Sequence, residues 1–161
     1  MKYGRVSISS LCLMVLVMVQ VSMAQNIQDI LDSHNTARAQ VGVGPLAWSD
    51  TLATYAQNYA ATMTSTCDLV HSGGKYGENL AGSTGSLTYV DSVNMWVAEE
   101  QNYDYSSNTC PGGDGVCGHY TQVVWKNTAN VGCGGVVCDN GGTFIICSYD
   151  PPGNFVGEWP Y

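Results

Sequence analysis

Positive charge is scarce in this sequence. Five lysine and arginine side chains stand against 13 aspartates and glutamates, which gives a formal net charge of −8 at pH 7. Binding to nucleic acid or to an anionic membrane requires a basic surface. We therefore expect no nucleic-acid partner and no charge-driven membrane attachment. The charge leaves an uncharged lipid or sterol open as a ligand.

Long apolar runs are also missing, apart from one near the start. Leu11 to Val19 (LCLMVLVMV) follows two basic residues, and Ser22-Met23-Ala24 supplies small residues for cleavage. This order is that of a secretory signal peptide. We predict a signal peptide over residues 1–24 and one mature domain over residues 25–161, with three cations against 13 carboxylates, a formal charge of 3 − 13 = −10.

The sequence motifs of common hydrolases are absent. The chain has neither the H-E-x-x-H of zinc proteases nor the G-x-S-x-G elbow of serine hydrolases. No N-x-S/T sequon occurs after residue 24, so we expect no N-glycosylation. These absences argue against the usual hydrolases and favour a protein that is not an enzyme, without deciding the question.

The cysteines indicate a disulfide framework. One of the seven lies in the signal peptide, and an even number in an exported chain predicts three disulfides with 15 possible pairings. A zinc cluster is disfavoured, because the chain is exported and lacks a C-x-x-C pair. The six that remain are Cys67, Cys110, Cys117, Cys133, Cys138 and Cys147.

The first half of the mature chain has helical periodicity. Apolar spacing predicts helices from Asn26 to about Val41, from Ser49 or Asp50 toward Cys67, and from about Ser86 to Gln101. His34 falls on the apolar stripe of the first helix, which is typical of a packed core histidine. The glycine-rich stretch HSGGKYGENLA at residues 71–81 predicts a loop.

The second half has extended character. Residues 121–125 (TQVVW), 131–138 and 143–149 are β-branched or apolar runs, and residues 139–142 (DNGG) form a good hairpin turn. Helices first and antiparallel strands later predict an α+β domain with helices packed on a sheet.

Four stretches together carry a resemblance to a known family. They are HSGGKYGENLA (71–81), NMWVAEEQNYDY (94–105), CGHYTQVVWKNT (117–128) and CSYDPPGNFVGEWPY (147–161). In this order they resemble the plant pathogenesis-related class 1 proteins of the CAP superfamily, which also contains cysteine-rich secretory proteins and antigen 5. The resemblance covers essentially the whole mature chain.

The resemblance implies a fold and a disulfide pairing. The fold is an α-β-α sandwich, the CAP domain, in which helices flank a mostly antiparallel sheet. The implied disulfides are Cys67 with Cys138, Cys110 with Cys117, and Cys133 with Cys147. Each is expected to contribute roughly 2–4 kcal/mol by restricting the unfolded chain.

The resemblance also implies a central cavity with two histidines and two acidic residues. Carried over by motif, these four residues, the tetrad, are His71, Glu78, Glu99 and His119. Glu100 lies nearer the helix stripe than Glu99, but the family motif places its glutamate at the offset of Glu99 from Trp96.

Such a tetrad has three chemical readings. The imidazoles can bind a divalent metal, zinc by default or copper or nickel, with the carboxylates as ligands or as acceptors that orient the rings. Alternatively, a glutamate with a raised pKa and a histidine can act as general acid and base in a hydrolase resembling a protease. The third reading is a structural network that ties loop, helix and strand together. No cofactor is required by any pattern in the sequence.

Two further features extend the implied function. Tyr103 and Tyr105 lie in a loop whose counterpart in related proteins is implicated in sterol binding, although both could simply cover a helix end. Residues 151–161 match a segment that plant members can release as a signalling peptide. Ser148 stands where asparagine is usual in the preceding C-N-Y-x motif, and an ordinary packed tail is the other interpretation.

The resemblance therefore implies a secreted plant defence protein. We expect it to act against fungi or oomycetes by binding a sterol or another lipid, with microbial membranes or effectors as further partners. The alternatives are a His/Glu hydrolase and the precursor of a defence-signalling peptide. We expect a monomer in the extracellular space, the apoplast, rather than the vacuole.

Overall fold

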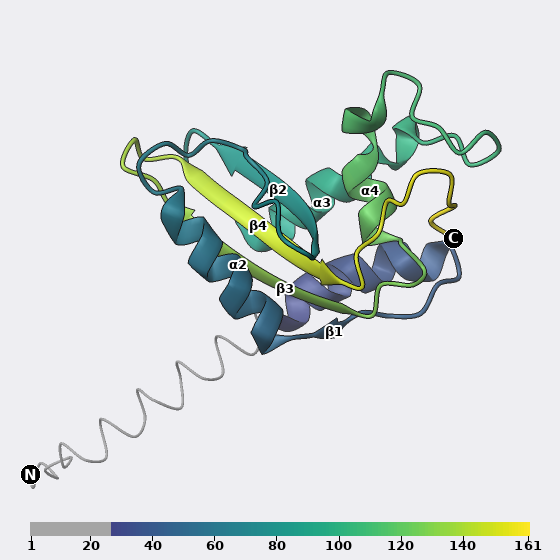
Figure 1. Cartoon of the computed structure of the whole chain (residues 1–161), viewed down its shortest axis with the longest axis horizontal. Helices are drawn as coiled ribbons and strands as arrows, with labels where there is room; N and C mark the ends of the chain where they lie inside the picture. The colour runs from purple at the N-terminus through teal and green to yellow at the C-terminus, as the bar shows by residue number, and fades with distance from the viewer. Residues whose placement is uncertain (1–26) are drawn as a thin grey trace, which may run out of the picture.

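The computed structural model describes residues 27–161 (Figure 1). The predicted signal peptide at residues 1–24 lies outside the described residues. Within residues 27–161, no helix is both long and apolar enough to cross a membrane. In chain order the elements are an N-terminal helix over residues 27–40, β1 (Ala47–Trp48), α2 (Asp50–Thr62), β2 (Gly77–Ser83), α3 (Tyr89–Val97), the 3₁₀ helices η1 (Ala98–Asn102) and η2 (Asp114–Val116), α4 (Gly118–Val123), β3 (Asn130–Val137) and β4 (Thr143–Asp150).

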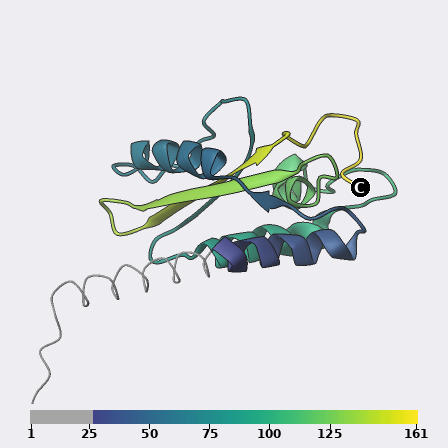
Figure 2. The same ribbon diagram turned by 90° about the horizontal axis from the view of Figure 1, so that it is seen from below.

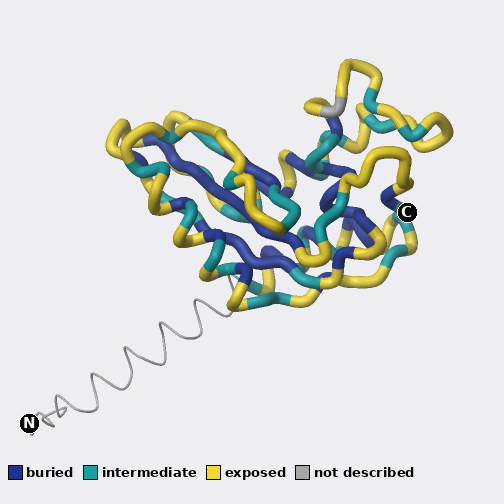
Figure 3. The backbone as a smooth tube through the Cα atoms, viewed as in Figure 1, coloured by how far each residue is buried: buried dark blue, intermediate teal, exposed yellow. Residues whose placement is uncertain are grey.

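The elements form three layers. Figure 2 shows α2 on one face of the sheet, with the N-terminal helix and α3 on the other. Because both faces are covered, seven consecutive residues of β4, from Thr143 to Tyr149, are buried (Figure 3). The predicted α-β-α sandwich is confirmed.

The sheet is mostly antiparallel, as the resemblance implies. Its strand order is β1-β3-β4-β2, in which only the short β1 runs parallel to its neighbour. The hairpin from β3 to β4 turns at Asn140 and Gly141, and Gly141 has a φ of +83°, which suits the left-handed conformation of this turn.

Close packing of α2 on β3 depends on two glycines. A β-carbon at Gly132 would lie 2.2 Å from the backbone nitrogen of Ala53, and one at Gly134 would lie 2.3 Å from that of Gln57. Side chains at these positions would force helix and strand apart. The glycines therefore set the distance between these two layers.

Two of the helices start at capping residues. Ser49 accepts a hydrogen bond from the Leu52 amide at the start of α2, and Thr88 does so from Asp91 at the start of α3. The helix predicted from about Ser86 to Gln101 is shorter at its start and continues beyond Val97 as the 3₁₀ helix η1.

The strand predicted at residues 121–125 is wrong, because residues 118–123 form α4. Residues Tyr120 to Val123 are all buried, so the segment has no alternating face. Arg38, which is 1% exposed, donates to the carbonyls of Val123, Trp125 and Thr128 at 2.9–3.0 Å. These tertiary bonds satisfy carbonyls at and beyond the end of α4 and override the β propensity of its side chains.

The loop predicted over residues 71–81 is correct only up to Tyr76. From Gly77 the chain forms β2, an edge strand paired with β4 from Gly77 opposite Tyr149 to Ser83 opposite Thr143. Polar and glycine residues obscured this strand because its apolar core is only Leu80 and Ala81.

All three implied disulfides are present: Cys67–Cys138, Cys110–Cys117 and Cys133–Cys147. The first links the segment that follows α2 to the residue directly after β3. The second closes the irregular loop before α4. The third joins directly opposed residues of β3 and β4.

Candidate functional site

His71 and Glu78 form the first of two histidine–glutamate pairs. Glu78 lies on β2, and its carboxylate accepts from His71 Nδ1 at 3.2 Å and from the Ser72 amide at 2.9 Å. The Ser72 hydroxyl also donates to this carboxylate. The Glu78 side chain is 5% exposed whereas that of His71 is 60% exposed. The glycine-rich loop thus folds back on the strand that follows it.

Glu99 and His119 form the second pair. Glu99 lies on η1 and accepts from His119 Nδ1 at 2.7 Å and from the His119 amide at 3.1 Å. Its neighbour Glu100 instead faces the hydroxyl of Tyr120 at 3.4 Å. The switch from α to 3₁₀ winding after Val97 accompanies this division of the two glutamates between different partners.

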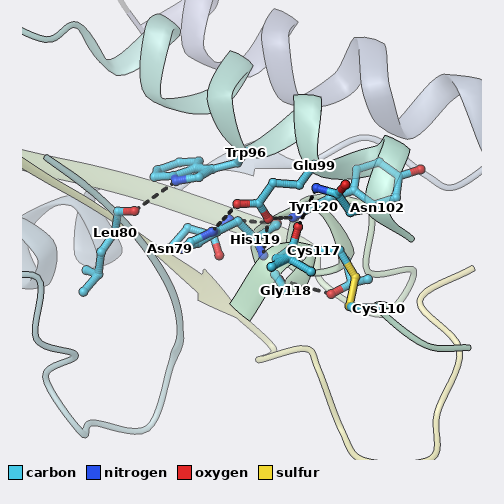
Figure 4. Close-up of polar contacts among 12 residues, drawn as sticks. Asn79, Leu80, Trp96, Glu99, Asn102, Cys110, Cys117, Gly118, His119 and Tyr120 are labelled. Carbon is cyan, nitrogen blue, oxygen red and sulfur yellow. Dashed lines mark hydrogen bonds and ion pairs between the residues drawn. A yellow bond between two sulfur atoms is a disulfide. The ribbon is translucent and has the colours of Figure 1, made fainter. Parts of the chain in front are cut away.

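Asn79 connects the two pairs. It follows Glu78 on β2, is 1% exposed, and donates from Nδ2 to the carbonyl of His119 at 3.0 Å (Figure 4). Trp96 lies behind His119, with the two rings stacked at 6.1 Å between centroids, and its Nε1 donates to the carbonyl of Leu80. One asparagine and one tryptophan therefore hold β2, α3 and α4 in register around the tetrad.

A buried chain of hydrogen bonds continues from Asn79 into the core. Asn79 Nδ2 also approaches the hydroxyl of Tyr149 at 3.3 Å, and that hydroxyl lies 2.9 Å from Nε2 of His34. Sequence reasoning missed Asn79 and Tyr149 as members of the site. The position of Asn79 directly after Glu78 is the only local signal that could have drawn attention to it.

The hydrogen bonds at Glu78 decide its charge. Burial alone would raise the pKa of this carboxyl, but hydrogen bonds from His71 and Ser72 outweigh burial and lower the pKa below its ordinary value. Glu78 is thus a carboxylate at neutral pH and has no proton to donate. This is the opposite of the raised pKa that a general acid requires.

Ser72 is not arranged as a nucleophile of the serine-hydrolase type. Its hydroxyl donates to Glu78 and lies 2.8 Å from the hydroxyl of Tyr55. Serine hydrolases need an imidazole to take the proton of the serine. Here Ser72 and His71 share the same carboxylate side by side, so they do not form a relay.

The two tetrad histidines, His71 and His119, each leave one ring nitrogen for another partner. Both use Nδ1 for a carboxylate, and neither Nε2 makes a hydrogen bond within residues 27–161. A carboxylate on the second nitrogen is the arrangement that orients metal-binding histidines. In the described part of the chain, however, no group of three or more His, Cys, Asp or Glu is placed to hold a metal ion. Within residues 27–161 the tetrad is therefore two histidine–glutamate pairs, each with a carboxylate on Nδ1 and Nε2 left without a hydrogen bond.

Tyr103 and Tyr105 contact the C-terminal tail. Tyr105 stacks on Tyr161 with 4.8 Å between ring centroids and donates to its carbonyl at 2.9 Å. The Tyr103 hydroxyl donates to Asn108, and burial raises the pKa of Tyr103 to about 12. A cavity of about 240 Å³ lies between this loop and residues 154–160. Drug-sized ligands usually occupy pockets of roughly 300–1,000 Å³, so this cavity is small for a whole sterol.

The tail is attached at several points. Trp159 Nε1 donates to the carbonyl of Tyr105 at 2.9 Å, and the Lys126 amide donates to Pro160 at 2.6 Å. Nearer its start, Asn154 exchanges hydrogen bonds with Thr121 and Gly118. In Figure 1 the tail lies beside α4. Despite these hydrogen bonds, residues 154–159 are all exposed.

Comparison with protein families and curated proteins gives consistent matches. Residues 31–149 match the CAP family, described as the cysteine-rich secretory protein family. The chain is 57% identical over 154 residues to pathogenesis-related protein 1A of Nicotiana tabacum, with 94% of this chain and 91% of the relative covered. It is 51% identical over 159 residues to pathogenesis-related protein 1 of Arabidopsis thaliana, with 99% and 97% covered.

Solved structures share the fold. Venom allergen-like protein 4 of Schistosoma mansoni is 27% identical with a TM-score of 0.65, covering 84% of this chain and 93% of that one. NaASP2, solved with Zn²⁺, is 25% identical with a TM-score of 0.66, and 83% of each chain is covered.

Proposed function

This chain belongs to the cysteine-rich secretory protein family, and on that premise we propose that it is a secreted defence protein that acts by binding a sterol or a similar uncharged lipid. The pathogenesis-related relatives from plants support a role in plant defence. The antimicrobial action, the lipid ligand and the apoplast as its location are the parts that this proposal adds.

The hydrogen bonding of the two glutamates is the observation that favours binding over catalysis. Glu78 and Glu99 each accept from an imidazole and from a backbone amide, and the lowered pKa of Glu78 removes it as a proton donor. In neither pair does the imidazole accept a hydrogen bond from a hydroxyl or thiol, and the Ser72 hydroxyl donates to the Glu78 carboxylate instead. Such pairs are suited to fixing the elements around them, and the net negative charge of the chain disfavours anionic ligands but not uncharged ones.

Equilibrium binding of a radiolabelled sterol to the purified mature protein tests this function. We expect saturable binding of ergosterol with a micromolar dissociation constant, measured below the solubility limit of the sterol. A reduced and unfolded sample of the same protein is the control for nonspecific adsorption. Absence of saturable binding with ergosterol and with plant sterols would refute the proposal.

We infer a second role for the tetrad, as a site for a divalent metal. His71 and His119 would hold the ion through Nε2, with Glu78 and Glu99 orienting the rings. When bound, zinc would supply a Lewis acid and a fixed positive charge. The protein's own residues hold the imidazoles in the required tautomer, because each Nδ1 faces a carboxylate.

Calorimetric titration with zinc tests the metal role. We expect one ion per chain in the wild type and loss of binding in His71→Gln and in His119→Gln. Asn79→Ala should weaken zinc binding without removing a ligand, because Asn79 holds the backbone of His119. Unchanged binding in both histidine variants would show that zinc binds elsewhere on the acidic surface.

Hydrolysis by the same four residues is the competing enzyme hypothesis. Activity of a purified sample should then disappear in a Glu78→Gln, Glu99→Gln double variant that remains folded by circular dichroism. Activity that persists would come from a contaminant.

Release of residues 151–161 as a signalling peptide is a further proposal, supported by the exposure of residues 154–159. Mass spectrometry of extracellular fluid after infection tests it. C-termini that remain intact would contradict it.

A further inference from the structure

The outer edge of β3 borders a second, larger cavity. Its volume is about 510 Å³, within the range of roughly 300–1,000 Å³ that is usual for small-molecule sites. The cavity, here the edge groove, lies among the N-terminal helix, β1, α2, the start of α3 and β3. Its apolar lining includes Ile27, Ile30, Trp48, Ala53, Tyr89 and Cys133.

The groove exists because β1 is too short to cover β3. β1 pairs with only two residues of β3, through Ala47 opposite Asn130 and Trp48 opposite Val131. Among residues 27–161, no strand neighbours the rest of the outer edge of β3. Unpaired edges expose backbone donors and acceptors, which need other partners.

Gln57 covers one part of this edge. Its side-chain amide donates to the carbonyl of Gly135 at 3.1 Å and accepts from the amide of Gly135 at 3.2 Å. On the other side, the carbonyl of Val131 accepts from the amide of Ser49 at 2.9 Å. Both residues of β3 therefore direct their backbone polar groups outward, away from β4.

Cys133 lies between these two positions and shares their direction. Residues two apart in a strand point their backbone groups to the same side. The distance of 4.0 Å between its Cα and that of its β4 partner is the close spacing of a pair without mutual hydrogen bonds. Its N–H and C=O consequently face the groove, and within residues 27–161 neither bonds to a side chain or to a backbone group outside the strands.

A third polar group is available nearby. The hydroxyl of Tyr89 would lie 3.3 Å from a β-carbon built on Gly135, which places it beside the same strand. This hydroxyl also makes no hydrogen bond to another described residue, and burial raises the pKa of Tyr89. It stays neutral and can donate or accept. The groove thus combines an apolar wall with a small cluster of neutral polar groups.

The charge of the groove selects among apolar ligands. Among the described residues that line the groove, Asp50 is the one with a carboxyl group, and it accepts from Trp48 Nε1 at 3.0 Å. None of the cations of the described chain, Arg38, Lys75 and Lys126, lines it. A fatty acid would bring a second negative charge without a positive partner. An uncharged molecule with one hydroxyl would satisfy both the N–H and the C=O of Cys133.

We propose that the edge groove is the binding site for an uncharged apolar alcohol of the sterol class, whose hydroxyl bonds the backbone of Cys133. The inference rests on the proposed lipid-binding function and gives it a location. It moves the ligand away from Tyr103 and Tyr105, because both side chains already contact Tyr161 in the tail and the cavity that Tyr103 borders has about half the volume.

Energy transfer from tryptophan to dehydroergosterol, a fluorescent sterol, measures binding to the mature protein. Thr54→Phe places a large side chain at the exposed rim of the groove, and Thr51→Phe makes the same change on an exposed part of α2 outside the lining. We expect Thr54→Phe to raise the dissociation constant about tenfold or more, which corresponds to a loss of about 1.4 kcal/mol in binding free energy. Thr51→Phe should leave it unchanged.

A second pair of variants keeps the test independent of crowding. Tyr89→Phe removes one hydroxyl from the groove, and Tyr103→Phe removes one from the tyrosine loop. We expect weaker binding in Tyr89→Phe alone. Dehydroergosteryl acetate, whose hydroxyl is blocked, should bind about tenfold more weakly than the free sterol, as expected for loss of a hydrogen bond to buried groups. The amide of Cys133 should gain hydrogen-exchange protection when dehydroergosterol is bound.

The possible results separate the site from the function. Normal sterol binding in Thr54→Phe and Tyr89→Phe, with loss in Tyr103→Phe, would overturn the edge groove and leave sterol binding in place at the loop. Equal binding of the acetate and the free sterol would overturn the role of Cys133. No binding of dehydroergosterol by the wild type would overturn both the site and the proposed function.

Discussion

Acidification should destabilise this protein through His34, a residue distant from the surface. His34 is fully buried on the N-terminal helix, with Nδ1 2.8 Å from the carbonyl of Ile30 and Nε2 2.9 Å from the hydroxyl of Tyr149. The carbonyl can only accept, so Nδ1 carries the proton and Nε2 accepts from Tyr149. A second proton on the ring would take away the acceptor that Tyr149 uses.

The size of the effect follows from the pKa of His34. Burial lowers the pKa from 6.5 to about 4, against the opposing hydrogen bond to Ile30, and Arg38 adds to the depression. A histidine whose pKa is depressed on folding contributes stability that is fully present above pH 6.5. That contribution is lost as pH falls toward 4, because the unfolded chain binds a proton that the folded chain refuses. Between pH 7 and pH 5 the expected loss is about 2 kcal/mol.

Urea unfolding of the mature protein at pH 7 and pH 5 provides the measurement. His34→Gln retains hydrogen-bonding groups but does not titrate, so its loss of unfolding free energy over the same interval should be smaller by about 2 kcal/mol. Proton NMR of the ring gives the pKa directly. Equal pH dependence in the two proteins, or a pKa of His34 near 6.5, would refute the reasoning.

Three other substitutions test the packing, the disulfides and the sheet edge. Gly134→Ala should destabilise the domain by about 1–3 kcal/mol or more in urea unfolding, because its β-carbon would lie 2.3 Å from backbone, whereas Gly85→Ala, with no atom within 4 Å, should be nearly neutral. Replacing both cysteines of the Cys67–Cys138 bridge by serine should lower the free energy of unfolding by about 4 kcal/mol, and the same change at Cys110–Cys117 should lower it by about 2.5 kcal/mol. The difference arises because the cysteines of the two bridges are separated by 71 and 7 residues in sequence. Equal losses would contradict the chain-entropy argument. Gln57→Ala should increase aggregation in light scattering by exposing the edge of β3, and unchanged scattering would argue against this protective role.

Local sequence signals predicted the parts of this fold that local physics controls. Ser49 caps α2 as expected, because its hydroxyl and the following apolar spacing are neighbours in the chain. Residues 143–149 form a strand that is buried on both faces. A short, continuous apolar run without helical spacing already indicates such a strand. His34 lies in the core, as its position on the apolar stripe of a helix predicts, because that stripe faces the interior.

Motif resemblance supplied what spacing alone left open. Six cysteines allow 15 pairings, and only the resemblance selected the three that the structure contains. It likewise assigned the four tetrad residues from stretches that are far apart in sequence. Spacing offers no reason for position 78 to lie near position 119, since the link is a hydrogen bond from Asn79 across 40 residues.

Only the tertiary structure decided the features that depend on long-range contacts. Residues 121–125 have strand propensity, yet three of them lie in α4 and two follow it directly. Arg38, 85 to 90 residues earlier, bonds carbonyls at and beyond the end of this helix. β2 exists because β4 offers it a partner edge, and Tyr103 and Tyr105 contact Tyr161 because the tail returns to them. The sequence by itself determined the export signal pattern, the acidic charge, the helix starts and the disulfide count, because each is a property of neighbouring residues or of composition. The chain's path through space determined which polar groups are satisfied and which, like the backbone of Cys133, face an open groove.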